Sequence, residues 1–81
     1  MTNDELERAR EGFSIQYDIG KYRERVGLMK STIKRINDYN KETVNVLDCW
    51  IDSDLASDAL SKQIKRYEQK IAELEKKFDE L

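Results

Sequence analysis

Residues 15–36 read IQYDIGKYRERVGLMKSTIKRI, and this stretch decides the fold. Its large apolar side chains recur at alternating steps of four and three residues, at Ile15, Ile19, Tyr22, Val26, Met29, Ile33 and Ile36. Heptad spacing of this kind places all of them on one face of an α-helix, and such a face needs another helix to cover it. The stretch therefore predicts a long helix with a partner helix packed along it.

The same spacing continues through four more residues, namely Asn40, Thr43, Leu47 and Trp50. We therefore expect the first helix to span about residues 4–50. The polar Asn40 at a seam position has two interpretations. It either fixes the register of the helix pair at some cost in stability, or it marks a break near 38–43 that leaves 43–51 as a short separate helix.

A second apolar seam follows the same alternation in the C-terminal part of the chain, at Leu60, Ile64, Tyr67, Ile71, Leu74, Phe78 and Leu81. It is out of phase with the first seam, and Ser and Asp residues, which are good helix N-caps, lie between the two. We therefore predict a turn at about 51–53, capping by Asp52 or Ser53, and a second helix over about 54–80. One continuous helix with a heptad interruption is the alternative.

The predicted fold class is thus all-α, an antiparallel, coiled-coil-like hairpin of two long helices in one domain, residues 1–81. With a turn near residue 52, Leu81 falls opposite about Tyr22, and residues 4–21 overhang. Two helices are too few to enclose a core, so we expect oligomerisation into a helical bundle or capture by another protein. The residues expected at that protein interface are Phe13, Ile15, Tyr17, Ile19, Tyr22 and Trp50.

The composition limits the kinds of site that this chain can form. The chain has 81 residues, 40% of them charged, with one cysteine, no histidine and no proline. An internal disulfide and a Cys–His nucleophile are excluded, and the common zinc sites lack their histidine ligands. We therefore predict no enzyme activity, no catalytic residues, no cofactor and no metal.

Charge is unevenly distributed although the net charge is only −2. Residues 1–18 carry about −3, residues 19–37 about +5 and residues 38–58 about −5. The basic stretch 21–35 has no nucleic-acid-binding motif, so we expect a solvated face and no nucleic-acid partner. No segment is apolar enough to cross a membrane, and the polar N-terminus and lone Cys49 favour a cytoplasmic protein.

Two glycines, Gly20 and Gly27, lie seven residues apart on the outer face of the first predicted helix. They either allow a third helix to approach closely or simply weaken the helix. Trp50 also has two interpretations. It either closes the open end of the helical hairpin or serves as a binding anchor, since Trp and Tyr are common in interface hot spots.

A Trp at the bend of a short, acidic helical hairpin resembles the WXG100 family of type VII secretion substrates and partner proteins. This chain has Trp50-Ile51-Asp52 where that family has Trp-X-Gly. The resemblance implies a secreted or structural hairpin that works as a heterodimer.

The function that the sequence favours is a non-enzymatic protein–protein interaction module, a small adaptor, regulator or inhibitor that binds another protein, itself, or both, with a homodimer expected. A WXG100-like role is one alternative, and a self-assembling structural coiled coil is the other.

Overall fold

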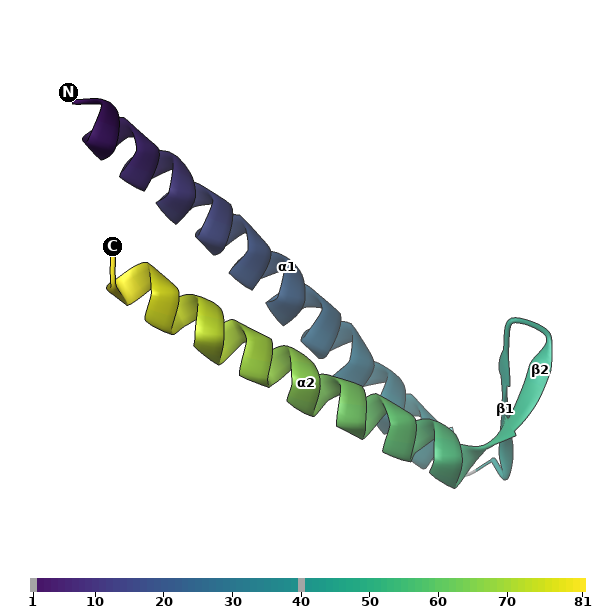
Figure 1. Ribbon diagram of the computed structural model, residues 1–81. Coiled ribbons are helices and arrows are strands. Elements are labelled where there is room, and N and C mark those ends of the chain that lie inside the picture. The colour runs from purple at the N-terminus through teal and green to yellow at the C-terminus, as the bar shows by residue number, and fades with distance from the viewer. Residues whose placement is uncertain (1, 40) are drawn as a thin grey trace.

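Two long antiparallel helices joined by a small β-hairpin make up the computed structural model, which describes residues 2–39 and 41–81. The elements are α1 (Asn3–Tyr39), β1 (Thr43–Val46), β2 (Cys49–Asp52) and α2 (Ser53–Asp79) (Figure 1). The molecule is elongated, 59 × 21 × 18 Å. The prediction of two packed helices is confirmed, whereas the β-hairpin was not predicted. In residues 2–39 and 41–81, neither helix combines the length and the apolar character that a membrane span requires.

Helix α1 begins with a capping box formed by Thr2 and Glu5. The Glu5 backbone N–H donates to Thr2 Oγ1 at 3.2 Å, and the Thr2 backbone N–H donates to Glu5 Oε2 at 3.3 Å. This reciprocal pair satisfies two backbone donors that have no partner within the first turn of a helix. The helix therefore has a defined start, close to the predicted residue 4.

The two predicted seams form the contact between α1 and α2. Ile15, Ile19, Val26 and Ile64 are buried. The other seam residues from Tyr22 to Leu74 that lie within the two helices are half-buried, whereas the seam positions Leu47 and Trp50 lie in the β-hairpin and are exposed. The rings of Tyr22 and Tyr67 meet at the centre, with their centroids 5.2 Å apart. Because burial of apolar surface is the main favourable term in folding, these residues hold the two helices together.

The connection between the helices differs from the prediction. Helix α1 ends at Tyr39, so the expected helix over about 4–50 is too long, and the expected turn at 51–53 is in fact strand and helix start. The alternative break near 38–43 has the correct position, but residues 43–51 form strands and not a short helix. Asn40, which prompted that alternative, lies outside the described residues.

Helix α2 starts where it was expected, with Asp52 at the N-cap position, but the capping chemistry is different. The Asp52 side chain makes no capping hydrogen bond. The neighbouring Ser53 instead forms hydrogen bonds between the start of α2 and the residues that precede β1. Its backbone N–H donates to the Glu42 carbonyl at 2.8 Å, and its hydroxyl donates to the Lys41 carbonyl. These bonds close the base of the β-hairpin onto α2.

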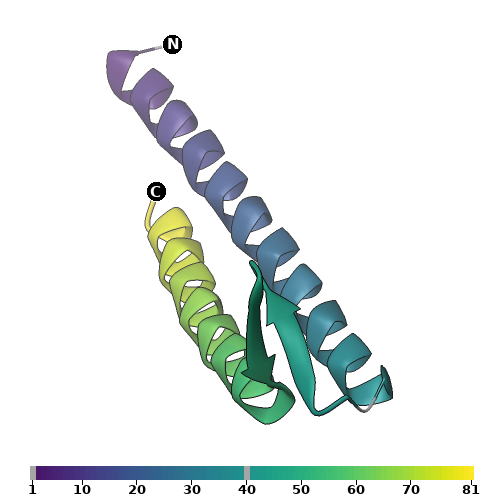
Figure 2. The ribbon, with the colours of Figure 1, turned by 90° about the vertical axis from the view of Figure 1, so that its right-hand side faces the viewer.

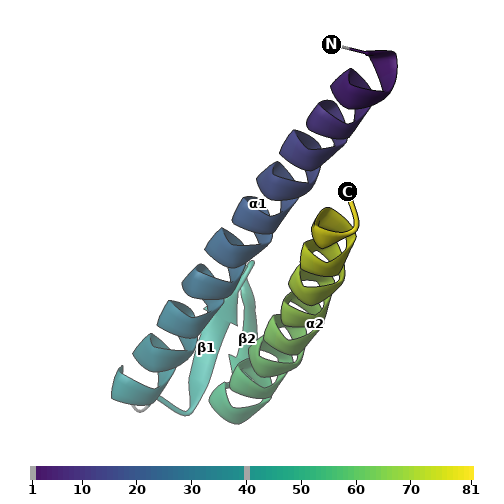
Figure 3. The same ribbon diagram turned by 90° about the vertical axis from the view of Figure 1, so that its left-hand side faces the viewer.

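The position of the connection changes how the helices are paired. A Cβ atom at Gly12 would lie 3.4 Å from the Phe78 ring and 3.7 Å from Leu81. The end of α2 therefore reaches Gly12 and not Tyr22, because the chain reverses around the centre of the hairpin and not at residue 52. The overhang of α1 is correspondingly short, as all three views of the ribbon show (Figures 1, 2 and 3).

Candidate interaction site

The β-hairpin presents two chemically different faces. Its strands pair antiparallel with Val44 opposite Ile51 and Val46 opposite Cys49, and these four side chains form an apolar face. The other face carries Thr43, Asn45, Trp50 and Asp52. Trp50 is 71% exposed, so the expectation that it closes the open end of the helical hairpin is wrong. The apolar face is the one turned toward the helix ends, where Val44 and Ile51 are half-buried, and Trp50 lies on the opposite face.

The tip of the hairpin is the two-residue turn Leu47-Asp48. Both residues have positive φ angles, 49° and 68°, as a type I′ turn requires. The Asp48 backbone N–H donates to Asn45 Oδ1 at 3.1 Å, which holds the turn in place. Leu47 is 93% exposed and packs against almost nothing. A large apolar side chain is therefore displayed at the very tip.

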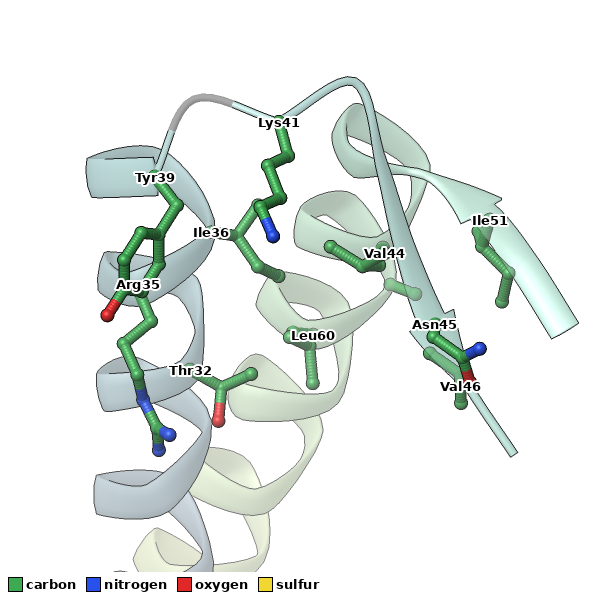
Figure 4. A pocket seen from close by; sticks show the side chains of 12 residues that line it. Thr32, Arg35, Ile36, Tyr39, Lys41, Val44, Asn45, Val46, Ile51 and Leu60 are labelled. Carbon is green, nitrogen blue, oxygen red and sulfur yellow. The ribbon is translucent and has the colours of Figure 1, made fainter. Parts of the chain in front are cut away.

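A cleft of about 570 Å³ lies between the hairpin and the adjoining ends of the two helices. Both strands contact α2, and the hairpin projects sideways from the adjoining ends of the helices (Figure 1). The lining is Thr32, Arg35, Ile36, Tyr39, Lys41, Val44, Asn45, Val46, Ile51, Ala56, Ala59 and Leu60, which we call the hairpin cleft. Ile36 and Val44 point toward one another across it (Figure 4).

Most of the lining of the hairpin cleft is aliphatic, contributed by α1, both strands and α2. Arg35, Tyr39 and Lys41 supply most of the polar groups. An apolar concavity with a few polar groups is the usual composition of a binding site. The hairpin therefore carries an exposed tryptophan and an exposed apolar tip, and it forms one wall of an apolar cleft.

The sequence did contain a signal for this site. Val44 and Val46 alternate with polar residues, and Cys49 and Ile51 fall on one face of a strand, a period of two that indicates β-structure. The heptad extension through Leu47 and Trp50 obscured it. The turn also lacks the Asn-Gly or Asp-Gly pair that usually marks a two-residue hairpin.

The predicted interface residues separate into three groups. Ile15 and Ile19 are buried under α2, so the expectation that they are uncovered is wrong. Tyr22 is half-buried against Tyr67. Phe13 and Tyr17 are 76% and 72% exposed on α1, and Trp50 is exposed on the hairpin, so these three side chains are accessible to a partner. They lie on two separate elements.

Part of the basic stretch 21–35 is engaged within the chain. Arg23 forms an ion pair with Glu75 on α2, and the Arg25 guanidinium lies 5.7 Å from the Tyr22 ring centroid and 5.8 Å from that of Tyr67. These contacts place two of the cations beside the helix pair. Among the residues that the structure describes, no three acidic or cysteine side chains gather closely enough to hold a metal ion.

Comparison with protein-family models, curated proteins and solved structures gives no match to this chain. Trp50, on which the resemblance to WXG100 proteins rests, lies in strand β2 and not in a turn between helices.

Proposed function

We propose that this chain is a non-enzymatic protein–protein interaction module, a small cytoplasmic adaptor, regulator or inhibitor that binds another protein through its β-hairpin. The exposure of Trp50 is the observation that carries the proposal. Large aromatic side chains contribute most of the binding energy in many protein interfaces. A tryptophan that stabilises no core within its own chain is well suited to that role.

The hairpin cleft supports the same proposal. Apolar side chains of a partner would fill the space between Ile36 on α1, Val44 on β1 and Leu60 on α2. Arg35 and Lys41 line the same cleft and would pair with carboxylates of the partner. Charged residues at the rim mainly set the association rate and the orientation, whereas the apolar centre supplies most of the affinity. We therefore propose a partner segment that is apolar at its centre and acidic at its edge.

The experiment compares capture by the wild-type chain and by Trp50→Ala. Each immobilised protein is incubated with lysate of the native host, and bound proteins are quantified by mass spectrometry. We expect at least one protein to bind the wild-type chain and to be lost with Trp50→Ala. Because Trp50 is exposed, its removal should leave the thermal unfolding midpoint unchanged.

Leu28→Ala is the matched control, because Leu28 is 61% exposed on α1 and lies outside the hairpin. Capture should survive this substitution. The partner identified in this way can be titrated into the wild-type chain, whose single tryptophan should show a blue-shifted emission on burial. Equal capture by the wild-type chain and Trp50→Ala would disprove the role proposed for Trp50.

A further inference from the structure

Helix α1 carries a second stripe of residues on the side facing away from α2. Phe13, Tyr17, Gly20, Glu24 and Gly27 follow one another at steps of four and three residues, so they share one face, which we call the α1 outer face. Phe13 and Tyr17 are largely exposed. A Cβ atom at Gly20 or Gly27 would meet nothing within 4 Å. The α1 outer face thus combines two projecting aromatic side chains with two glycines that leave depressions beside the backbone. No other described part of the chain covers these rings or fills these depressions.

The third glycine of the same helix shows what such a depression accommodates. At Gly12 the space beside the backbone is filled by the Phe78 ring and the Leu81 side chain from α2. The Phe78 ring packs at van der Waals distance from the position that a Cβ atom would occupy, so it covers a part of the helix surface that has no side chain. The helix surface at Gly20 and Gly27 likewise has no side chain, and no described residue covers it. The aromatic rings of Phe13 and Tyr17 are exposed and pack against no such surface within the described chain. The α1 outer face therefore carries both uncovered glycines and exposed aromatic side chains, the two kinds of residue that pack together at Gly12 and Phe78.

We propose that the α1 outer face binds the α1 outer face of a second copy of this chain, with the two helices antiparallel and crossing near Gly20. In this arrangement Phe13 of each copy lies opposite Gly27 of the other, and the two Gly20 residues meet near the twofold axis. Such an interface is isologous, because both copies contribute the same residues and each contact occurs twice. Glycine at the crossing lets the two backbones approach closely, as small residues do in other closely packed helix pairs.

The charges along α1 specify the antiparallel orientation. Glu5 lies at the edge of this face in the N-terminal part of α1, and Lys34 and Arg35 lie at its edge in the C-terminal part. An antiparallel pair places Glu5 of one helix opposite Lys34 of the other. A parallel pair would place like charges together, which is unfavourable. The occupant that fits this face in both shape and charge is therefore another copy.

The proposed dimer leaves the hairpins at its two ends. Each hairpin follows the C-terminal end of α1, and antiparallel pairing sends those ends in opposite directions. The interface proposed here and the hairpin cleft are therefore separate surfaces, and either can fail without the other. A dimer would present two copies of the hairpin, which strengthens binding to a partner with two matching sites.

The first test measures mass in solution by light scattering over a range of protein concentrations. We expect the wild-type chain to be dimeric at tens of micromolar, and Gly20→Arg to raise the dissociation constant at least about tenfold. Gly20 is exposed, and arginine is a better helix former than glycine, so the helices of the variant should be retained in circular dichroism. Ser61→Arg, an equal charge at an exposed position on α2, is the control and should remain dimeric. A monomeric wild-type chain, or a Gly20→Arg variant that dimerises as well as wild type, would overturn the proposal.

The second test measures orientation by disulfide cross-linking in a Cys49→Ser background, which removes the only native thiol. Gly20→Cys should form a disulfide-linked dimer on mild oxidation, because the two thiols meet near the axis. Phe13→Cys should not, because fourteen residues of helix, about 21 Å, separate the two thiols in an antiparallel pair. Efficient cross-linking at residue 13 would indicate a parallel pair and refute the proposed arrangement.

Discussion

The ring of Phe78 lies over Gly12, with its Cε2 atom 3.4 Å from the position of a Cβ atom on that glycine. Leu81 lies beside it, 3.7 Å from the same position. This contact shows where the end of α2 packs on α1, at a distance that leaves room for no more than a small side chain at residue 12. It also explains why Ile15 and Ile19, one and two turns further along α1, are buried under α2.

Substitutions at Gly12 test the tightness of this contact. In Gly12→Ala, the new methyl group makes an ordinary contact with Phe78 and removes the helix penalty of glycine. We expect the free energy of unfolding to rise by about 0.5–1 kcal/mol in urea denaturation. In Gly12→Leu, the longer side chain displaces the Phe78 ring, and the free energy of unfolding should fall below that of Gly12→Ala. Greater stability of the leucine variant would show that the end of α2 is not held at this position.

Ile19 is the most deeply buried large side chain, at 2% exposure. Removal of such an aliphatic group from a core costs about 2–5 kcal/mol. A domain of this size has little stability to lose, so we expect Ile19→Ala to abolish the cooperative thermal transition. Leu28→Ala removes an exposed side chain from the same helix and should change the free energy of unfolding by less than about 0.5 kcal/mol. Equal effects of the two substitutions would contradict the assignment of the core.

The two helices were predictable because their seams repeat over many turns. Seven apolar residues from Ile15 to Ile36 follow heptad spacing, which indicates a helix and not a strand. All seven are buried or half-buried. The start of α2 was predictable for a similar reason, since Asp52 and Ser53 suit a helix N-terminus. The periodicity of the apolar residues therefore predicted the two helices, and the residue preferences of a helix N-terminus predicted where α2 begins.

The β-hairpin was not predicted. Because it was missed, the predicted end of the first helix, the turn and the pairing of the helices were displaced along the chain. Thr43, Leu47 and Trp50 satisfy the heptad spacing by coincidence, although their neighbours alternate as strands do. Placing the turn near residue 52 then displaced the helix pairing and left Ile19 without a partner. A segment of ten residues carries too few repeats to separate the two periods, so the outcome depends on tertiary packing that the sequence pattern does not contain.

Tyr22 and Tyr67 join the two helices near the middle of their contact, with the ring planes inclined by 39°. Aromatic pairs in such tilted arrangements contribute about 0.5–1.5 kcal/mol beyond their buried area. A double-mutant cycle with Tyr22→Leu and Tyr67→Leu should give a coupling energy in that range. For comparison, the exposed Arg23–Glu75 ion pair should give a coupling energy below about 1 kcal/mol that falls with added salt. A coupling of zero for the tyrosines would show that the rings only fill space.

The turn at Leu47-Asp48 places a leucine and an aspartate where a type I′ turn favours asparagine and glycine. A left-handed conformation costs an L-residue about 1–2 kcal/mol, and Leu47 regains none of this by packing because it is 93% exposed. We therefore expect the double substitution Leu47→Asn and Asp48→Gly to stabilise the hairpin by about 1 kcal/mol.

Amide hydrogen exchange is the measurement for this prediction, because strand amides exchange when the hairpin opens. The Val46 and Cys49 amides, which flank the turn, should be protected about fivefold more in the double variant, the factor that corresponds to 1 kcal/mol. Leu47→Ala is the control, since it removes the exposed side chain but keeps a Cβ atom in the left-handed conformation, and its protection should match the wild type. Faster exchange in the double variant would mean that Leu47 stabilises the hairpin through its side chain, contrary to its exposure at the tip.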